Sequence, residues 1–252
     1  MPKSGLGKAV IFLIVGLSPL IVGIILVLII KNELFESVIM SSCIVMGGFL
    51  DVFILKKEYG VRLQEKISPK IDIKLIFIVI ILAVGYTITT GSTLNREFLI
   101  DVYGQNDYLT AFDWVAVGLC APVGEELVFR YAIFSSICDG NKKRNVIVAY
   151  IFSSFLFMIN HLDNNITRNI DLFIFGIITA AIFYFSKNLI YNIVFHSFSN
   201  ITIYSIACLF QRIPFNDKIL LFSVPLLIMA LALLILYFKN KTCIKKYNEM
   251  KF

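Results

Sequence analysis

Two adjacent carboxylates and a guanidinium interrupt a largely apolar stretch in the middle of the chain. Glu125, Glu126 and Arg130 lie within residues 111–138, a segment dominated by apolar side chains. Charged side chains at membrane depth are expensive, so they usually face a protein interior or a wet cavity and mark function. We therefore take these three residues as the centre of a candidate site.

The spacing of the three charges divides them into two groups. Adjacent residues of a helix point about 100° apart, so Glu125 and Glu126 cannot share a face. Glu126 and Arg130 are four residues apart, a spacing that favours an ion pair, and this leaves Glu125 as the carboxylate available for chemistry. Pro122 suits the first turn of a helix, and a helix beginning there would place both glutamates at its N-terminus, where the dipole favours ionised carboxylates. The alternative is that all three charges only hold helices together.

The chain has only two histidines, and both fall within or at the end of predicted membrane helices. Phe157 precedes His161 by four residues and Asn200 follows His196 by four residues, so each pair shares a helix face. An imidazole and a carboxamide so placed can donate to a developing oxyanion. A carboxylate assisted by an imidazole can act as a general base toward water. With Glu125 as that base, the set predicts hydrolysis of a peptide bond inside the membrane.

Three short motifs follow one another on successive predicted helices and carry a resemblance to a known family. The motifs are Glu125-Glu126-x-x-x-Arg130, Phe157-x-x-x-His161 and His196-x-x-x-Asn200. In this order they resemble the CPBP family of intramembrane CAAX proteases and bacteriocin-processing enzymes, also called the Abi family. The resemblance covers roughly residues 122–200 and implies an intramembrane endopeptidase.

The resemblance also implies a role for each motif residue. Glu125 would be the base that activates water, with His161 as its partner. His196 and Asn200 would stabilise the oxyanion. The remaining motif residues would support the site: Glu126, Arg130 and Phe157.

No metal or other cofactor is firmly predicted. The family is commonly labelled as metalloproteases, but the same residue set also suits a metal-free, glutamate-dependent protease. Glu125, His161 and His196 could hold Zn²⁺ with water in the fourth position. The His-Glu-x-x-His helix signature of many zinc proteases is absent. We therefore lean against a metal and keep Zn²⁺ as the alternative.

Hydropathy determines which elements must carry these residues. Of the 252 residues, 58% are hydrophobic, and the mean hydropathy is +0.84. A spanning helix needs about 20 apolar residues, and eight stretches qualify: 9–30, 37–55, 73–90, 111–138, 145–161, 170–186, 189–210 and 217–238. The sequence thus predicts an all-α, polytopic bundle of about eight transmembrane helices. We expect one integral membrane domain over residues 1–252, with the catalytic motifs within 111–210.

The net charge of +6 reflects membrane topology rather than a nucleic-acid partner. Most Lys and Arg residues fall in alternate connections and in the C-terminal tail. The positive-inside rule then places both termini in the cytoplasm. Small size and a Lys-, Ile- and Asn-rich composition favour a bacterial cytoplasmic membrane. The expected partners are the lipid bilayer and a peptide or membrane-anchored substrate. The resemblance points to a role in bacteriocin or signal-peptide maturation, self-immunity or protein trimming.

Two other functions compete with proteolysis. One is a non-proteolytic membrane regulator or bacteriocin self-immunity protein. Such a protein would not need to retain the motif residues. The other is a proton-coupled transporter that uses the buried acids and histidines as a relay, although two repeated halves with broken helices are not evident.

Asp51, near one end of the second predicted span, is expected to snorkel or to make a structural hydrogen bond.

Overall fold

The computed structural model describes residues 5–30, 33–59, 71–93, 111–138, 143–161, 163–212 and short pieces between 227 and 238. Over these residues the chain is helical and contains no strand, as the sequence predicts. Among them, four helices are long and apolar enough to cross a membrane: Gly5–Ile30, Val38–Lys57, Ile73–Gly91 and Ile166–Ser186. The span predicted at 217–238 lies mostly outside the described residues. The number of eight spans and the cytoplasmic termini therefore stay predictions.

The helices fall into two compact units. The first unit comprises Met1–Pro69 with Asp107–Ser197, and the second comprises Lys70–Asn106 with Phe198–Phe252. Helix α11 (Leu189–Arg212) contributes residues to both units. The expectation of one membrane domain with its catalytic motifs at 111–210 stays a prediction.

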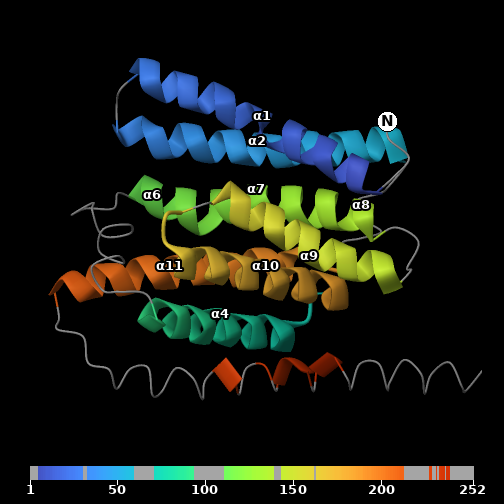
Figure 1. The fold of residues 1–252 in the computed structure, drawn as a ribbon. Helices are drawn as coiled ribbons and strands as arrows, with labels where there is room; N and C mark the ends of the chain where they lie inside the picture. The colour runs from blue at the N-terminus through green and yellow to red at the C-terminus, as the bar shows by residue number, and fades with distance from the viewer. Residues whose placement is uncertain are drawn as a thin grey trace, which may run out of the picture. The chain divides into compact units, whose positions relative to one another are not determined.

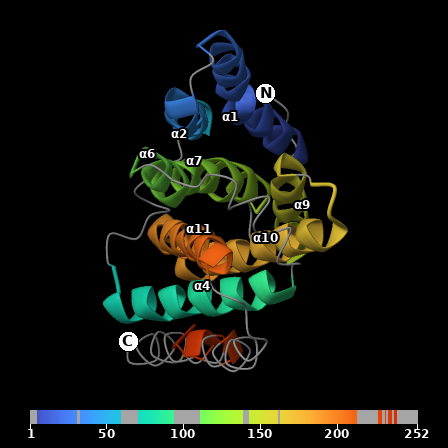
Figure 2. The same cartoon turned by 90° about the vertical axis from the view of Figure 1, so that its left-hand side faces the viewer.

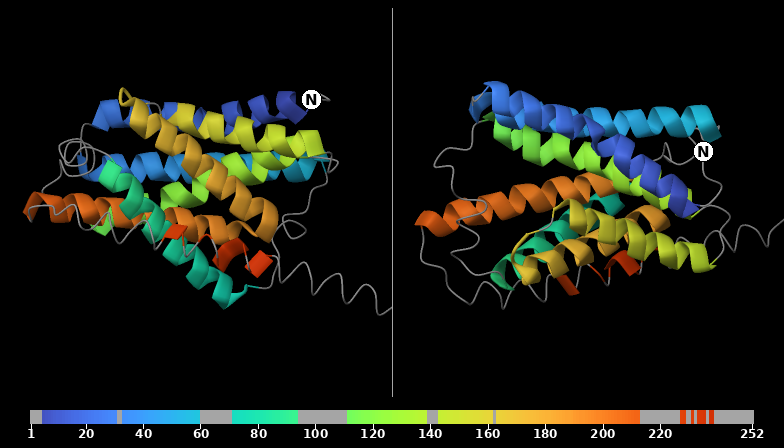
Figure 3. Two further views of the ribbon diagram at one scale, coloured as in Figure 1. Left: turned by 60° about the horizontal axis from the view of Figure 1, so that its bottom comes forward. Right: turned by 45° about the horizontal axis from the view of Figure 1, so that its top comes forward.

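A long helical segment, here called the central helix, runs through the first unit (Figure 1). It consists of α6 (Ala111–Val115), η1 (Ala116–Cys120), α7 (Ala121–Glu126), η2 (Leu127–Phe134) and α8 (Ser135–Ile137). Helices α1 (Gly5–Ile30) and α2 (Glu33–Tyr59) pack against one another and against this segment (Figures 2 and 3). Helices α9 (Lys143–Asn160) and α10 (Ile166–Ser186) pack together and also contact η2. The central helix therefore packs against α1, α2, α9 and α10.

Glycines bring the helices of the first unit unusually close. A Cβ atom on Gly47 of α2 would lie 1.7 Å from the backbone oxygen of Gly16 on α1. A Cβ atom on Gly124 of α7 would lie 2.6 Å from the backbone carbon of Ile44 on α2. Small residues at such crossings allow backbones to approach, which favours helix association in lipid. These contacts fix the position of α7, which carries both glutamates.

The outward-facing side chains of α1 are apolar. Six large aliphatic residues along it are more than half exposed: Ile14, Ile21, Val22, Ile25, Leu28 and Ile29. An exposed apolar surface of this kind would be an aggregation liability in water, whereas lipid tails cover it without cost. Together with the four long apolar helices, this surface identifies an integral membrane protein.

Asp51 on α2 differs from its sequence-based expectation. Its side chain is fully buried, and neither carboxylate oxygen has a hydrogen-bond partner in the part of the chain that the structure describes. A Cβ atom on Gly16 would approach both Asp51 Oδ2 and the side chain of Val128. The carboxylate therefore lies where α1, α2 and η2 meet. It does not snorkel, because the close glycine crossing encloses it.

The second unit is described only in part. Helix α4 (Ile73–Thr93) is apolar and carries Gly91, whose Cβ atom would lie 3.3 Å from Ile203 Cδ1 on α11. Tyr237 donates a hydrogen bond of 2.5 Å to Asp72, just before α4. These contacts join three segments that are distant in sequence.

Candidate active site

The central helix carries both glutamates without a break at Pro122. The backbone is right-handed helical at Cys120 and Ala121, and Pro122 lies in the first turn of α7. The preceding turn, η1, has the wider hydrogen-bond pattern of a π-helix. This pattern accommodates a proline that has no N–H to donate and whose ring crowds the preceding turn. The helix N-terminus considered from the sequence is therefore not present at the glutamates.

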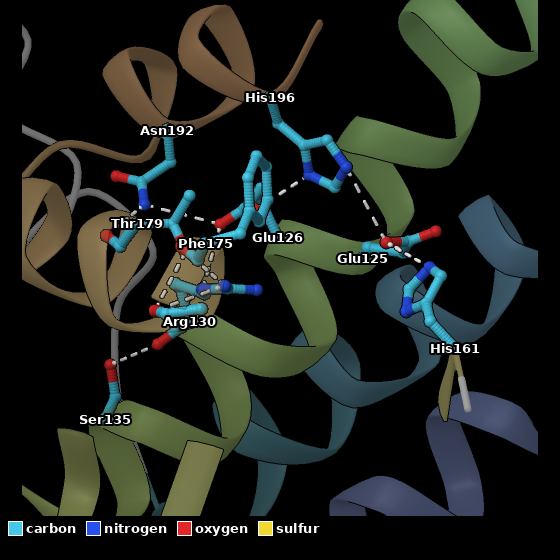
Figure 4. A network of polar contacts seen from close by, with 10 residues as sticks. Glu125, Glu126, Arg130, Ser135, His161, Phe175, Thr179, Asn192 and His196 are labelled. Carbon is cyan, nitrogen blue, oxygen red and sulfur yellow. Dashed lines mark hydrogen bonds and ion pairs between the residues drawn. The ribbon is translucent and has the colours of Figure 1, made fainter. Parts of the chain in front are cut away.

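The two glutamates point to different partners (Figure 4). Glu126 forms the ion pair with Arg130 that their spacing predicts, with 3.3 Å between Glu126 Oε2 and Arg130 Nε. Both side chains are fully buried. Glu125 instead faces His161 and His196, the two histidines of the chain. The division into a paired and a separate carboxylate thus holds in the structure.

Both histidines approach the same oxygen of Glu125. His161 Nε2 lies 3.4 Å from Glu125 Oε2, and His196 Nε2 lies 3.8 Å from it. That oxygen has no hydrogen-bond partner among the described residues. Helix α7, the turn that follows α9, and helix α11 supply the three groups. The distances are longer than a direct hydrogen bond, so each group can still bond to a ligand atom between them.

The other ring nitrogen of each histidine is held by an acceptor. His161 Nδ1 lies 3.0 Å from the carbonyl oxygen of Phe157, which can only accept, so this nitrogen carries a hydrogen. His196 Nδ1 lies 2.9 Å from Glu126 Oε1. Glu126 Oε2 already faces Arg130 and the amide of Asn192, so Glu126 is a carboxylate and also accepts from the ring. These partners assign Nδ1–H to both rings and direct both Nε2 atoms at Glu125.

The assignment has a consequence for the protons of the site. In a neutral ring with Nδ1–H, Nε2 carries a lone pair. Two such lone pairs facing Glu125 Oε2 would repel the ionised carboxylate. The arrangement is favourable when a proton resides on an Nε2 atom or on Glu125. The site is therefore suited to hold a proton and to pass it on.

Aromatic rings surround the two histidines. The Phe157 ring lies 4.6 Å from the His161 ring and 5.8 Å from the His196 ring, centroid to centroid. Phe175 lies 4.8 Å from the His196 ring. The guanidinium of Arg130 also sits over Phe157, 4.6 Å from its centroid. Phe157, expected to support the site, thus orients His161 with both its ring and its carbonyl.

The residues of the site differ in exposure. The His161 side chain is 27% exposed, compared with 8% for Glu125 and 4% for His196. Glu126 and Arg130 are fully buried. His161 is therefore the most exposed of these five side chains, whereas Glu126 is enclosed by its partners.

Asn200 is the remaining residue of the predicted set. It follows His196 by one turn on α11 and belongs to the second compact unit. Its role beside His196 stays a prediction.

Two buried polar residues of the network were not predicted from the sequence. Asn192 donates to Glu126 Oε2 over 3.3 Å and to the Thr179 carbonyl over 2.6 Å. The Thr179 hydroxyl accepts a hydrogen bond from Arg130. Asn192 precedes His196 by one helical turn, and this spacing was a usable signal. Nothing in the sequence around Thr179 distinguishes it from other hydroxyls in apolar helices.

A metal ion would need several side-chain ligands arranged around one point. Across the described ranges, no group of three or more His, Cys, Asp or Glu side chains is arranged to hold a metal ion. The two Nε2 atoms approach Glu125 itself. We therefore derive no step through a metal.

A comparison with protein families decides the affiliation of the segment that carries the glutamates and histidines. Residues 107–202 match the family model described as type II CAAX prenyl endopeptidase Rce1-like. Over these residues the chain is similar to the Rce1-like family, which is consistent with an intramembrane CAAX protease. No curated protein and no solved structure is significantly similar to the chain. The Rce1-like match supports intramembrane endopeptidase activity and agrees with the resemblance carried by the three motifs.

Proposed function

We propose that this Rce1-like protein hydrolyses peptide bonds of peptide or membrane-anchored precursors with a water activated by Glu125. The observation that carries the proposal is the approach of both histidine Nε2 atoms to one otherwise unpaired oxygen of Glu125. Glu126, by contrast, forms an ion pair with Arg130 and contacts Asn192 and His196.

The proposed reaction begins with water bound between Glu125 and His161. Glu125 takes one proton from the water, and the hydroxide oxygen attacks the carbonyl carbon of the substrate. His196 Nε2 donates to the oxyanion that forms, and Asn200 is its expected partner. Because Nδ1–H of His196 is already bound to Glu126, Nε2 can donate only when the ring is fully protonated. The buried Glu126 carboxylate stabilises that cation.

The second half of the reaction returns the proton. The tetrahedral intermediate collapses, the C–N bond breaks, and the proton held by Glu125, with His161 as its partner, passes to the leaving amine nitrogen. The products are a carboxylic acid and an amine, and Glu125 regains its starting state. One water is consumed and no oxidant or reductant is needed.

The first test compares two changes from carboxylate to carboxamide at buried positions. Purified protein in detergent or nanodiscs would be given three substrates: a prenylated peptide ending in a CaaX sequence, the same peptide without its lipid, and a single-span precursor. Glu125→Gln is expected to lower kcat by about a hundred- to ten-thousandfold. Asp51→Asn, a matched change at the buried acid of α2, is expected to leave cleavage unchanged.

The outcomes separate the alternatives. Equal cleavage by wild type and Glu125→Gln would remove Glu125 from the reaction. A cellular phenotype fully rescued by a variant with alanine at Glu125, His161 and His196 would favour a non-proteolytic regulator. Loss of cleavage on chelation and recovery with Zn²⁺ would establish the metal-dependent alternative.

A further inference from the structure

Asn192 lies deep in the first unit, at the point where α10, α11 and the central helix meet. Its side chain is fully buried and lies one helical turn before His196. The amide nitrogen contacts two groups that can only accept, the carbonyl oxygen of Thr179 at 2.6 Å and Glu126 Oε2 at 3.3 Å. These acceptors fix the orientation of the amide, because only its nitrogen can donate to both. Asn192 therefore links Glu126 to the backbone of α10.

Thr179 connects the same turn of α10 to Arg130. Its hydroxyl accepts from Arg130 Nη2 and lies within hydrogen-bond distance of the carbonyl oxygens of Phe175 and Gly176. Arg130 in turn forms the ion pair with Glu126. Glu126 Oε2 is thus held from two sides, by Asn192 and by Arg130, and both of these residues are anchored to one turn of α10.

Holding Glu126 Oε2 determines where Glu126 Oε1 lies. That oxygen accepts from His196 Nδ1 at 2.9 Å, and this contact keeps Nε2 of the ring directed at Glu125. A carboxylate with a free rotation about its last bond would hold the imidazole less firmly. The chain of contacts therefore runs from the α10 backbone through Asn192 and Glu126 to His196.

We propose that Asn192 is a positioning residue of the hydrolytic site: by anchoring Glu126 to Thr179, it fixes the ring orientation of His196, with Nδ1–H on Glu126 and Nε2 directed at Glu125. This inference rests on the function proposed above. Asn192 touches no reacting atom and acts only through Glu126. Its own oxygen, Oδ1, has no hydrogen-bond partner among the described residues, so the donated hydrogen bonds carry its effect.

The chain offers a matched control one turn earlier on the same helix. Asn188 is also fully buried, and its Oδ1 accepts from the Ile190 N–H over 2.9 Å at the start of α11. This contact caps a helix and does not involve Glu126 or His196. Asn188→Ala should therefore lower thermal stability without changing the chemistry of the histidine.

The kinetic experiment compares Asn192→Leu with Asn188→Ala in the full-length protein. Leucine keeps the branching of the asparagine side chain at Cγ, although it is larger, and removes both donated hydrogen bonds. We expect Asn192→Leu to lower kcat roughly ten- to a hundredfold with KM little changed, and to displace the pH–rate profile. Asn188→Ala should give a pH–rate profile that superimposes on that of the wild type. Asn192→Gln, which keeps the amide, should recover part of kcat.

A second measurement reads the histidine directly and needs no substrate. Because the chain has only two histidines, nitrogen NMR of protein labelled in the histidine rings contains two sets of signals, which His161→Gln assigns. In wild type and Asn188→Ala, we expect His196 to show Nδ1–H. In Asn192→Leu, its ring signals should move or broaden by exchange, and those of His161 should not.

The two measurements distinguish failure of this inference from failure of the proposed function. If Glu125→Gln cleaves as the wild type does, the proposed function fails, and the NMR comparison still tests Asn192. If His196 signals and the pH–rate profile are the same in Asn192→Leu and wild type, Asn192 is only structural and the inference is overturned. A change in His196 signals confined to Asn192→Leu supports it.

Discussion

At the scale of single residues, the site consists of two carboxylates that are adjacent in sequence but differ in their surroundings. Glu126 has an ion pair to Arg130 and hydrogen bonds from Asn192 and His196. Glu125 has two imidazoles nearby and an oxygen without a hydrogen bond. A saturated buried carboxylate stays ionised and fixed, whereas an unsaturated one can exchange a proton with water. This difference is the physical basis for assigning structure to Glu126 and chemistry to Glu125.

The same contrast predicts different consequences for the two histidines. His161 is partly exposed, so His161→Ala should lower kcat by about a hundredfold or more and leave the thermal midpoint nearly unchanged. His196 is buried and donates to Glu126. Removing it deprives a buried carboxylate of a partner, so His196→Ala should lower both kcat and the thermal midpoint. Activity assays and thermal unfolding in the same detergent measure both effects. Equal thermal midpoints for the two variants would contradict the distinction.

At the scale of helices, the position of the reacting groups depends on close crossings. The Gly16–Gly47 crossing joins α1 to α2, and the Gly124–Ile44 contact joins α2 to the helix of the glutamates. The π-helical turns η1 and η2 flank α7 and change which residues face each neighbour. Such wide turns occur frequently at functional sites because they redirect side chains within a continuous helix.

Helix crossing can be tested with two glycine-to-alanine substitutions. A Cβ atom on Gly47 would lie 1.7 Å from a backbone oxygen of Gly16, so α1 and α2 would have to separate in Gly47→Ala. We expect a clearly lower thermal midpoint, with a loss of about 1–3 kcal/mol in the free energy of unfolding.

Gly91→Ala is the matched control on α4. There the added methyl group would lie 3.3 Å from the flexible tip of Ile203, which can move aside at little cost. Thermal unfolding followed by helical circular dichroism should show a small change. A larger loss in Gly91→Ala than in Gly47→Ala would mean that the α1–α2 crossing is not as close as described.

At the scale of the whole molecule, the residues proposed to catalyse the reaction are buried polar groups in a largely apolar membrane protein. The first unit contains Glu125, His161 and His196, while Asn200 belongs to the second. Helix α11 is shared by both units. Hydrolysis at Glu125 would require water to reach this part of the chain.

The topology predicted from the positive charges can be tested with reporter fusions. We expect a reporter fused after Phe252 to behave as cytoplasmic, because the basic C-terminal tail should stay on the inner side. Replacing the tail lysines with glutamine is expected to weaken this preference. A reporter exported from the unaltered C-terminus would contradict the cytoplasmic C-terminus, and with it either the predicted orientation or the even number of spans. The bacterial cytoplasmic membrane likewise stays a prediction.

The sequence alone determined the helical class, the membrane setting and the residues worth testing. Hydropathy depends on composition over about 20 residues, and the Glu126–Arg130 pair depends on helical periodicity, so both can be predicted from local sequence. The three short motifs, in their order along the chain, also pointed to CAAX proteases, the kind of enzyme that the match over residues 107–202 names.

Only the tertiary structure decided how the predicted residues meet. Spacing along one helix cannot show that His196 Nδ1 contacts Glu126 while Nε2 faces Glu125, because those groups lie on different helices. Spacing also could not identify Thr179 and Asn192 as residues that anchor Glu126 and Arg130. It could not show that Asp51 is enclosed without a hydrogen-bond partner among the described residues, or that the helix continues from η1 through Pro122. Each of these features depends on helix packing and on hydrogen-bond acceptors from distant segments. Local sequence specifies the chemical groups, and long-range packing determines which of them can act together.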